Sequence, residues 1–352
     1  LARSAPVQVE ILMTTPMLPS IPSSLEPILP RDAAHRRKFL PIESPWQHIR
    51  KSECISPGEG TNPLLAIGVI SSMRNARQRQ AIRDTWLSSL TERFGVGVVQ
   101  YRFFVGILSI TSRQALSGEL VVPWEAVREI ETYGDVVVMA HEDTYASVYH
   151  RAVGIFHWGV KDCNADFVMR ANDDIYVALD PLVAHMSRQR PFSIYMGYFI
   201  SDALVCRPDS RDMPGSGTNK MGGGSGRFVT GRKGDKSLCF SVSHYPADNY
   251  PKVFAQGNAI ILSGDIAEEV GAIVDKPWRA PMPDDVTVAM VAYSRGAAIH
   301  SLSASWSPDE SAVACQAEAV IHFDLDTTVM RRMHWNLLAG EGICTGVERW
   351  RE

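Results

Sequence analysis

Several features that would each define a class of protein are missing from this 352-residue sequence. No run of eighteen apolar residues occurs, so the sequence offers no helical membrane span. The six cysteines include no CxxC pair, which excludes a zinc ribbon or a thioredoxin-type motif. No Asn-x-Ser/Thr sequon is present, so this segment carries no acceptor for N-glycans. The formal net charge is only -4, which argues against a protein that binds nucleic acid through bulk attraction to phosphate.

The remaining composition is that of a globular protein. Hydrophobic residues make up 45% of the chain and charged residues 21%, which excludes a wholly disordered or fibrous protein. The chain is long enough to bury a stable hydrophobic core without disulfides or a structural metal. The first residue is Leu1 rather than Met, so we interpret the chain as processed or truncated, and a signal or anchor upstream of Leu1 stays open.

Two segments differ from the rest of the chain. Residues 1–60 contain nine of the 21 prolines, which break any long helix or strand, and we expect a Pro-rich stem or linker there. Residues 215–236 form a Gly-rich insertion that also carries basic side chains but has no GxxxxGK[ST] motif. We expect a surface loop there, with a substrate-facing lid as the alternative. Residues 61–352 would then form one large domain.

Strand patterns alternate with helix patterns along that domain. The apolar run at 64–70 predicts a strand buried on both faces. Further strands are predicted at 101–108, 135–139, 167–170, 259–262 and 319–323, and helices at 77–90, 113–131, 144–158, 265–274 and 286–294. This alternation predicts an α/β fold with a mostly parallel sheet whose faces are covered by helices. Ligands bind at the carboxyl ends of strands in such sheets.

Two pairs of adjacent carboxylates are candidates for chemistry. Asp173 and Asp174 follow a predicted buried strand, where they are costly unless solvated, paired or bound to a cation. Mg²⁺ and Mn²⁺ take such oxygen ligands and bridge phosphates. The alternative is a loop in which one acid caps the next helix. Asp284 and Asp285 precede a predicted helix, either as an N-cap with an acidic first turn or as a general base.

Basic side chains gather at the first junction between a strand and a helix. Arg74, Arg77, Arg79 and Arg83 lie there, and arginine forks near a helix N-terminus suit a diphosphate. A solvated basic helix face is the alternative. His322 lies in an apolar strand, which is typical of a core histidine, and it becomes a metal candidate only because carboxylates elsewhere could share an ion.

Taken together, these segments resemble the β-1,3-glycosyltransferase family of the galactosyltransferase type, which has the GT-A fold. The blocks that carry the resemblance stand in the order of that family: Arg77–Trp86, Tyr133–Val136, Glu142–Tyr145 with Arg151, Asn172–Asp174, Tyr250–Pro251, Asp284–Val286, and His322 with Met330 and Trp335. Two positions depart from its pattern. Asn172 replaces the first acid of the family's DDD triplet, and Asp284 shortens the usual Glu.

The resemblance implies an inverting glycosyltransferase that moves a hexosyl unit, galactose or N-acetylhexosamine, from a UDP-sugar to an acceptor hydroxyl. The product would be a β-1,3 linkage on a glycan or glycoprotein acceptor, in protein glycosylation. Asp285 would be the catalytic base, with Asp284 as the second choice. The implied metal set, for Mn²⁺ or Mg²⁺, is Asp174, Asp173 and His322. The implied donor-binding set is Ser71, Arg77, Arg83, Asp143, Arg170 and Asp173.

Two alternatives remain beside the active enzyme. Asn172 removes a charge from the site, which leaves open a UDP-sugar-binding homologue with weak or no turnover. An unrelated α/β binding module is the other.

The resemblance further implies a type II membrane protein of the Golgi or ER lumen, whose anchor would lie upstream of Leu1. An oxidising lumen fits paired cysteines. Six cysteines allow fifteen pairings. Among them we consider Cys315 with Cys344, and Cys206 with Cys239, which would close the Gly-rich insertion.

Overall fold

A computed structural model describes residues 54–107, 124–144, 147–201, 251, 253–275, 283–305 and 315–346. Most of the expected stem, the Gly-rich insertion at 215–236 and the pairing of Cys206 with Cys239 lie outside the described residues. Within these ranges, the helices are all too short or too polar to cross a membrane.

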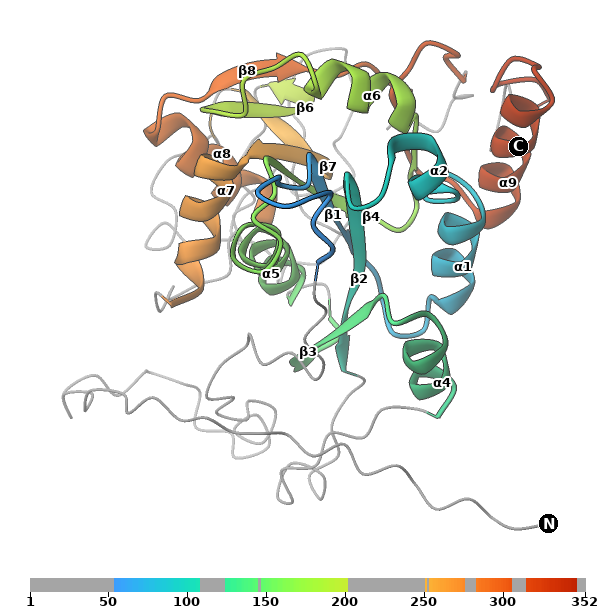
Figure 1. The fold of residues 1–352 in the computed structure, drawn as a ribbon, viewed down its shortest axis with the longest axis horizontal. Helices are drawn as coiled ribbons and strands as arrows, with labels where there is room; N and C mark the ends of the chain where they lie inside the picture. Colours follow the sequence, from blue (N-terminus) through green and yellow to red (C-terminus); the bar gives the residue numbers. More distant parts are fainter. Residues whose placement is uncertain are drawn as a thin grey trace, which may run out of the picture.

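A seven-stranded sheet forms the middle layer of the fold (Figure 1). Its strands, in spatial order, are β3 (Val136–Glu142), β2 (Val99–Ile107), β1 (Leu65–Ile70), β4 (Phe167–Asn172), β7 (Val253–Ser263), β6 (Ile194–Ser201) and β8 (Ala298–Ser301). All neighbours pair in parallel except those of β7, which runs antiparallel to β4 and β6. This is the mixed, mostly parallel sheet that was predicted, as expected of a GT-A fold.

The position of β1 in the middle of the sheet explains why its sequence is continuously apolar. Every residue of β1 is buried, and its side chains alternate between two core clusters. Leu65, Ile67 and Val69 join the cluster on one face, and Ala66 and Ile70 join the cluster on the other. A strand covered on both faces has no position for a polar side chain.

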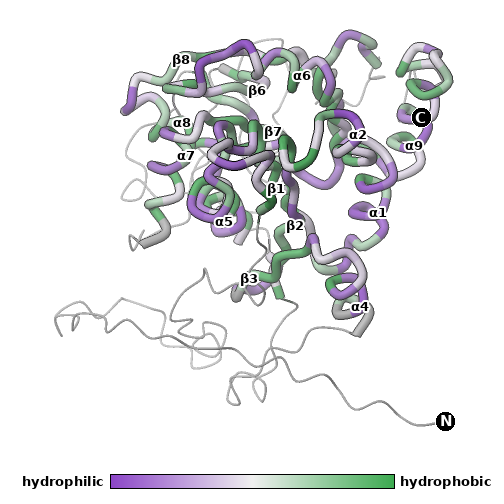
Figure 2. Tube along the Cα trace, in the orientation of Figure 1, coloured by the Kyte–Doolittle hydropathy of each residue, from purple (hydrophilic) through white to green (hydrophobic). Residues whose placement is uncertain are grey.

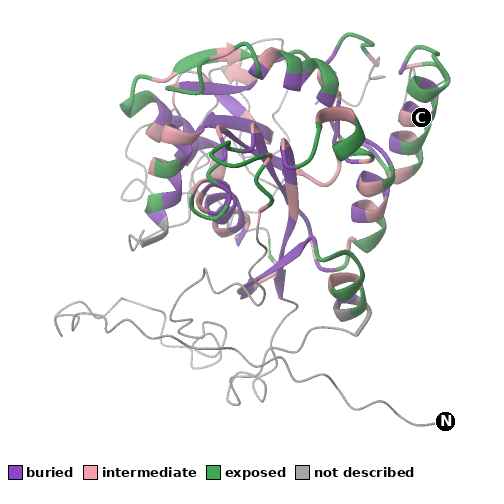
Figure 3. Ribbon diagram, in the orientation of Figure 1, coloured by how far each residue is buried: buried purple, intermediate pink, exposed green. Residues whose placement is uncertain are grey.

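Helices cover both faces of the sheet (Figure 1). On one side lie α5 (Val148–Lys161), α7 (Gly264–Gly271) and α8 (Asp284–Ser294), and on the other α1 (Ala76–Asp84), α2 (Leu90–Phe94), α4 (Trp124–Tyr133) and α9 (Thr327–Leu338). Hydropathy and burial follow this layering, because the strands are hydrophobic and buried while the outer surfaces of α1 and α9 are hydrophilic or exposed (Figures 2 and 3).

Smaller elements complete the fold beside the main sheet. They are α6 (Leu179–Met186), the 3-10 helix at Ala272–Asp275, and a second sheet in which β10 (Ile321–His322) lies between β5 (Tyr176–Val177) and β9 (Ala304–Ser305). Because β5 follows Asp174 closely, this small sheet brings the chain around His322 back toward the end of β4.

The predicted strands are present, but one predicted helix is wrong as a single element. The helix expected at 77–90 ends at Asp84, and α2 follows separately. The break occurs at Thr85, whose backbone leaves the helical region at ψ -111° and whose hydroxyl donates to the carbonyl of Ala81 at 2.6 Å. The strand predicted at 259–262 is longer than expected, since β7 has eleven residues.

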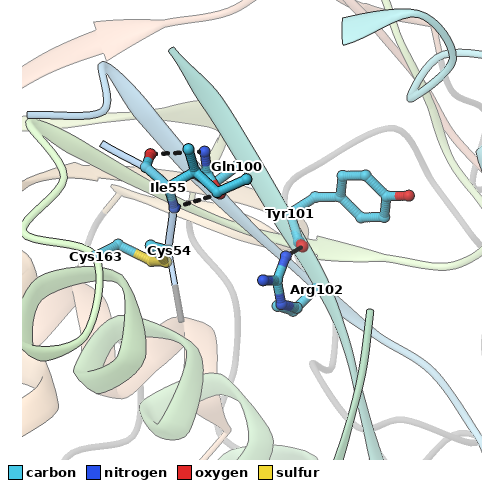
Figure 4. Close-up of a disulfide and its surroundings, with 6 residues drawn as sticks. All are labelled: Cys54, Ile55, Gln100, Tyr101, Arg102 and Cys163. Carbon is cyan, nitrogen blue, oxygen red and sulfur yellow. Dashed lines mark hydrogen bonds between the residues drawn. A yellow bond between two sulfur atoms is a disulfide. The ribbon is translucent and has the colours of Figure 1, made fainter. Parts of the chain in front are cut away.

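Two disulfides join distant parts of the described chain. Cys315 and Cys344 are bonded, as considered from the sequence. Cys54 is bonded to Cys163, just beyond the end of α5 (Figure 4). The adjacent Ile55 also exchanges two hydrogen bonds with the side-chain amide of Gln100, near the start of β2. These contacts, which we call the Cys54 clasp, hold the start of the described chain against the amino ends of the strands.

Candidate functional site

The ends of β1 and β4 meet because the two strands are adjacent and parallel, with Ile70 opposite Asn172. Ser71 follows β1 directly, and its hydroxyl donates to Oδ2 of Asp173 at 2.7 Å. Asn75 donates to the same oxygen at 2.9 Å. Burial raises the pKa of Asp173, and these two hydrogen bonds oppose that shift. The structure therefore brings together Ser71 and Asp173, two members of the predicted set.

The basic cluster on α1 divides into residues with different surroundings. Arg79 is fully buried, donates to the Ser71 hydroxyl at 3.0 Å and forms an ion pair with Glu129 of α4. Arg83 lies one helical turn further along and forms ion pairs of 2.9 Å with Glu129 and 2.8 Å with Asp135.

These contacts place Arg79, rather than the expected Arg83, at the edge that carries Asp173. Arg83 is instead held in the packing of α1 against α4 and β3, with its guanidinium 4.0 Å from the centre of the Tyr133 ring. Its two carboxylate partners hold it there. Its expected role beside the nucleotide stays a prediction. Arg77 is exposed on α1.

Asp143 links the end of β3 to the same edge. Its Oδ2 accepts hydrogen bonds from the hydroxyl of Ser72 at 2.6 Å and the backbone amide of Met73 at 2.8 Å. Its Oδ1 accepts from Arg151 of α5 at 2.7 Å, and Arg151 also donates to the carbonyl of Ser71 at 2.9 Å. Asp143 thus fixes the loop after β1, which places it near the predicted donor site.

Asp174 is a carboxyl group in an unusual setting. Its Oδ1 is buried and has no hydrogen-bond partner in the part of the chain that the structure describes. Burial, then the charges of Asp173 and Asp324, raise its pKa to about 6. Asp324 lies in the loop after β10, which is anchored by the amide of Leu325 donating to the Asp174 carbonyl at 2.8 Å. Asp324 was not foreseen from the sequence.

His322 is fully buried on β10, where it pairs with Tyr176 of β5. Burial lowers its pKa to about 4, so the imidazole is neutral at pH 7, which is the form that ligates metals. No described group of three or more His, Cys, Asp or Glu side chains is arranged to hold a metal ion. The buried, unpartnered oxygen of Asp174 and a neutral imidazole are nevertheless ligand types that suit Mn²⁺ or Mg²⁺.

The second acidic pair opens α8. Asp285 is 5% exposed, and its carboxylate accepts from the amide of Val286 at 2.8 Å and from the backbone of Gly257. Burial, then the charge of Asp284, raises the pKa of Asp285 to about 7. Arg170 of β4 brings its Nη2 within 2.8 Å of Oδ2 of Asp284. Through Arg170 the start of α8 is therefore joined to β4, the strand that Asp173 follows.

A bulge in β7 completes this arrangement. Gly197 of β6 pairs with Ile260 of β7, and Phe199 pairs with Ala255. Between these pairs β6 has one residue, whereas β7 has four, residues 256–259. The extra residues bring Gly257 to Asp285 and place Asn258 so that its Oδ1 accepts from Nδ2 of Asn172 at 2.9 Å. A glycine within a strand is a signal for such a bulge, but nothing in the sequence pointed to Asn258.

The galactosyltransferase family model matches residues 77–303. β-1,3-Galactosyltransferase GALT1 of Arabidopsis thaliana is 29% identical over 242 residues, which cover 66% of this chain and 31% of that protein. Hydroxyproline O-galactosyltransferase GALT2 of Arabidopsis thaliana is 28% identical over 162 residues, 46% of this chain and 21% of that protein. Lactosylceramide 1,3-N-acetyl-beta-D-glucosaminyltransferase A of Danio rerio is 24% identical over 275 residues, 76% and 62% of the two chains.

The chain thus spans less than a third of the length of these two plant relatives. Among solved structures, mannosyltransferase PcManGT from Pyrobaculum calidifontis, in complex with GDP-Man and Mn²⁺, aligns with a TM-score of 0.36 at 14% identity, over 86% of this chain and 68% of that one. The family model covers well over half of the 352 residues and spans both acidic pairs. The chain therefore belongs to the galactosyltransferase family.

Proposed function

We propose that the protein is an inverting glycosyltransferase that moves a hexosyl unit from a UDP-sugar to the hydroxyl of a glycan or glycoprotein acceptor. One observation carries the proposal. Arg170 of β4 forms an ion pair with Asp284 and donates a hydrogen bond to Asn172, which directly precedes Asp173 and Asp174. Burial raises the pKa of Asp174 to about 6 and that of Asp285 to about 7.

Asp285 has the properties of a general base. Its raised pKa of about 7 lies near neutral pH, where a base is both available and strong enough to remove a proton. The deprotonated carboxylate would take the proton of the acceptor hydroxyl as that oxygen attacks the anomeric carbon. The bond between this carbon and the diphosphate oxygen breaks, and UDP leaves on the opposite side. A single displacement of this kind inverts the configuration at the anomeric carbon.

Asp174, Asp173 and His322 would hold a divalent cation, Mn²⁺ or Mg²⁺. The unpartnered oxygen of Asp174 and the neutral imidazole of His322 fit such an ion. When bound, the ion neutralises the charge that develops on the departing diphosphate. Arg79, which already touches Ser71, adds a fixed positive charge at the same edge.

The proposed sugar, linkage and acceptor are supported by the names of the relatives rather than by the geometry of the site. Their names include β-1,3-galactosyl and 1,3-N-acetylglucosaminyl transfer and transfer to hydroxyproline. We therefore propose galactose or N-acetylhexosamine as the sugar, a β-1,3 linkage and a role in protein glycosylation. The two disulfides fit an oxidising lumen of the Golgi or ER, reached by a type II membrane protein.

A donor and acceptor screen tests the proposal. The protein is incubated with Mn²⁺ and UDP-galactose, UDP-GlcNAc, UDP-glucose or UDP-GalNAc across a panel of glycan and peptide acceptors, and UDP release is followed. We expect acceptor-dependent release from one donor, and linkage analysis of the product then tests the β-1,3 assignment. UDP that raises Tm without any release would favour the binding homologue. No release and no rise in Tm would contradict both functions.

A further inference from the structure

Arg170 is a buried cation that reaches from β4 to the start of α8. It is 2% exposed, and its Nη2 lies 2.8 Å from Oδ2 of Asp284. Its Nη1 donates to Oδ1 of Asn172 at 2.8 Å. A buried guanidinium is costly unless its charge is balanced, and of these two partners only Asp284 is a carboxylate. Arg170 and Asp284 therefore form a charge-balanced pair next to Asp285.

The side-chain amide of Asn172 is held from both ends. Its oxygen accepts from Arg170, and its nitrogen donates to Asn258 on the bulge of β7. A neutral amide orients Arg170 without competing for its charge. A carboxylate at position 172, where the family pattern has an acid, would place a second negative charge on Arg170 and weaken its hold on Asp284.

We propose that Arg170 is a positioning residue for the acidic pair Asp284–Asp285, and that Asn172 reserves the positive charge of Arg170 for this pair. The inference rests on the proposed function, because it treats the pair as the base. It departs from the expectation that Arg170 binds the nucleotide, since here Arg170 acts through Asp284 and need not touch the donor.

Among the groups that the structure describes around the pair, Arg170 is the cation that acts on Asp285. Tyr195 of β6 faces the pair, and its pKa is raised by burial and further by the two aspartates, so it stays neutral. From β7 the pair receives the backbone of Gly257, and α5 and α7 bury apolar side chains in the same core cluster as α8. Burial and Asp284 raise the pKa of Asp285, while Arg170 lowers it.

Replacing Arg170 with Met and with Lys tests the proposal. Without the cation Asp285 is harder to ionise, so in Arg170→Met the rising limb of kcat/KM against pH should move up by about one unit or more. kcat at pH 7 should fall at least about thirtyfold, within the range of general base catalysis. UDP and Mn²⁺ affinity should stay within about threefold. Arg170→Lys keeps the charge and should return the limb close to that of the wild type.

Arg295→Met is the matched control, because Arg295 forms an exposed ion pair with Glu269 at the other end of α8. It should leave the limb, kcat and both affinities unchanged. A loss of UDP or Mn²⁺ affinity in Arg170→Met with an unmoved limb would overturn the proposal and assign Arg170 to the donor.

A second readout does not depend on turnover. In Arg170→Met the carboxylate of Asp284 is buried without its cation, so Tm should fall more at pH 8 than at pH 5.5, where the pair holds a proton. An equal fall at both pH values would overturn the role of Arg170. Absence of UDP release from the wild type as well would defeat the proposed function, and the Tm comparison would still decide this inference.

Asn172→Asp tests the part played by the amide. Its added charge should move the limb of kcat/KM upward, as in Arg170→Met but less far, with Mn²⁺ affinity unchanged when measured by the EPR signal of the free ion. A gain of tenfold or more in Mn²⁺ affinity with an unmoved limb would show that position 172 serves the metal, which contradicts the proposal.

Discussion

Asp285 is buried beside a second carboxylate, and both features favour its protonated form. Its pKa is about 7 in the folded protein against 3.8 for an ordinary aspartate, so the folded state binds the extra proton between these values. Stability that this proton provides is present at low pH and is lost as the pH rises through about 7. The same burial that suits a base therefore destabilises the protein under mildly alkaline conditions.

We predict that Asp285→Asn separates catalysis from stability. Turnover should fall at least about a hundredfold because the base is lost, while UDP binding stays near normal. Tm at pH 8 should rise above that of the wild type, because a buried charge has been removed, and the gain should shrink at pH 5. UDP release and calorimetric unfolding at both pH values check this. A loss of turnover below tenfold would move the base role to Asp284.

Asp174→Asn should remove the metal-dependent part of UDP binding. The amide cannot supply the negative charge that a divalent cation needs, so affinity for UDP with Mn²⁺ should drop at least about tenfold, and affinity without Mn²⁺ should not change. In the wild type, Mn²⁺-dependent affinity should weaken as the pH falls below about 6, where Asp174 takes up a proton. Isothermal titration with and without Mn²⁺ measures both. Unchanged Mn²⁺-dependent affinity would reject the metal role.

Single residues differ in how far their surroundings follow from sequence. The sequence placed Ser71 and Asp173 after predicted strands, but their contact depends on β1 and β4 being neighbours, which the structure shows. The different contacts of Arg79 and Arg83 could not be predicted from the sequence, because both residues lie on one helix face. Which of them reaches the strand edge depends on Glu129 and Asp135, which fold in from some fifty residues away.

At the scale of elements, the contact between β1 and α5 depends on a glycine, which has no side chain. A Cβ at Gly68 would lie 2.3 Å from both Cγ atoms of Ile155, so the glycine lets α5 pack directly against the central strand. Gly159 on α5 plays the same part toward Val168 of β4, where a Cβ would lie 2.5 Å from Cγ1. Close packing of this kind tolerates little added volume.

We predict that Gly68→Ala lowers the free energy of unfolding by about 1–3 kcal/mol, since the added methyl must displace Ile155 or shift α5. Adding Ile155→Ala should recover part of that loss by making room. Gly342→Ala is the control, because its Cβ would meet Thr345 at an ordinary 3.5 Å. Urea unfolding of the four proteins provides the comparison. An equal loss in Gly68→Ala and Gly342→Ala would argue against the packing explanation.

Elements with strong local patterns are the ones that sequence predicts. β1 and β4 are buried throughout or nearly so, and their apolar runs identify them. β8 is mostly exposed at the edge of the sheet and has no such run, so it was missed. β6 was missed as well although its sequence is largely apolar, so an apolar run alone does not identify a strand. The end of α1 at Asp84 was missed as well, because the helical spacing of apolar residues continues past the break at Thr85.

At the scale of the whole molecule, the reactive edge and the Cys54 clasp lie at opposite ends of the strands. Ser71 and Asp173 follow the carboxyl ends of β1 and β4, while Gln100 of the clasp lies near the start of β2. The net charge of -4 gives no hint of this organisation, because it averages the local acids against the buried arginines. Nor could spacing reveal the bond from Cys54 to Cys163, which depends on how α5 ends beside the start of the sheet.

The separation of the two ends leads to a prediction about the disulfides. Replacing Cys54 and Cys163 with Ser opens a link between residues 109 apart, and the chain-entropy model gives a loss of about 5 kcal/mol. Replacing Cys315 and Cys344, which are 29 apart, should cost about 3.5 kcal/mol on the same model. Because the clasp is remote from Asp173 and Asp285, the first variant should keep the UDP affinity and kcat of the wild type at temperatures well below its lowered Tm.

The second disulfide is closer to the site, since Cys315 lies shortly before β10 and His322. Its removal should therefore weaken Mn²⁺-dependent UDP binding, although this variant unfolds at the higher temperature of the two. Calorimetry and isothermal titration on both double variants decide the matter. A clasp variant that loses activity at temperatures well below its own Tm would mean that the amino ends of the strands are coupled to the edge that carries Asp173.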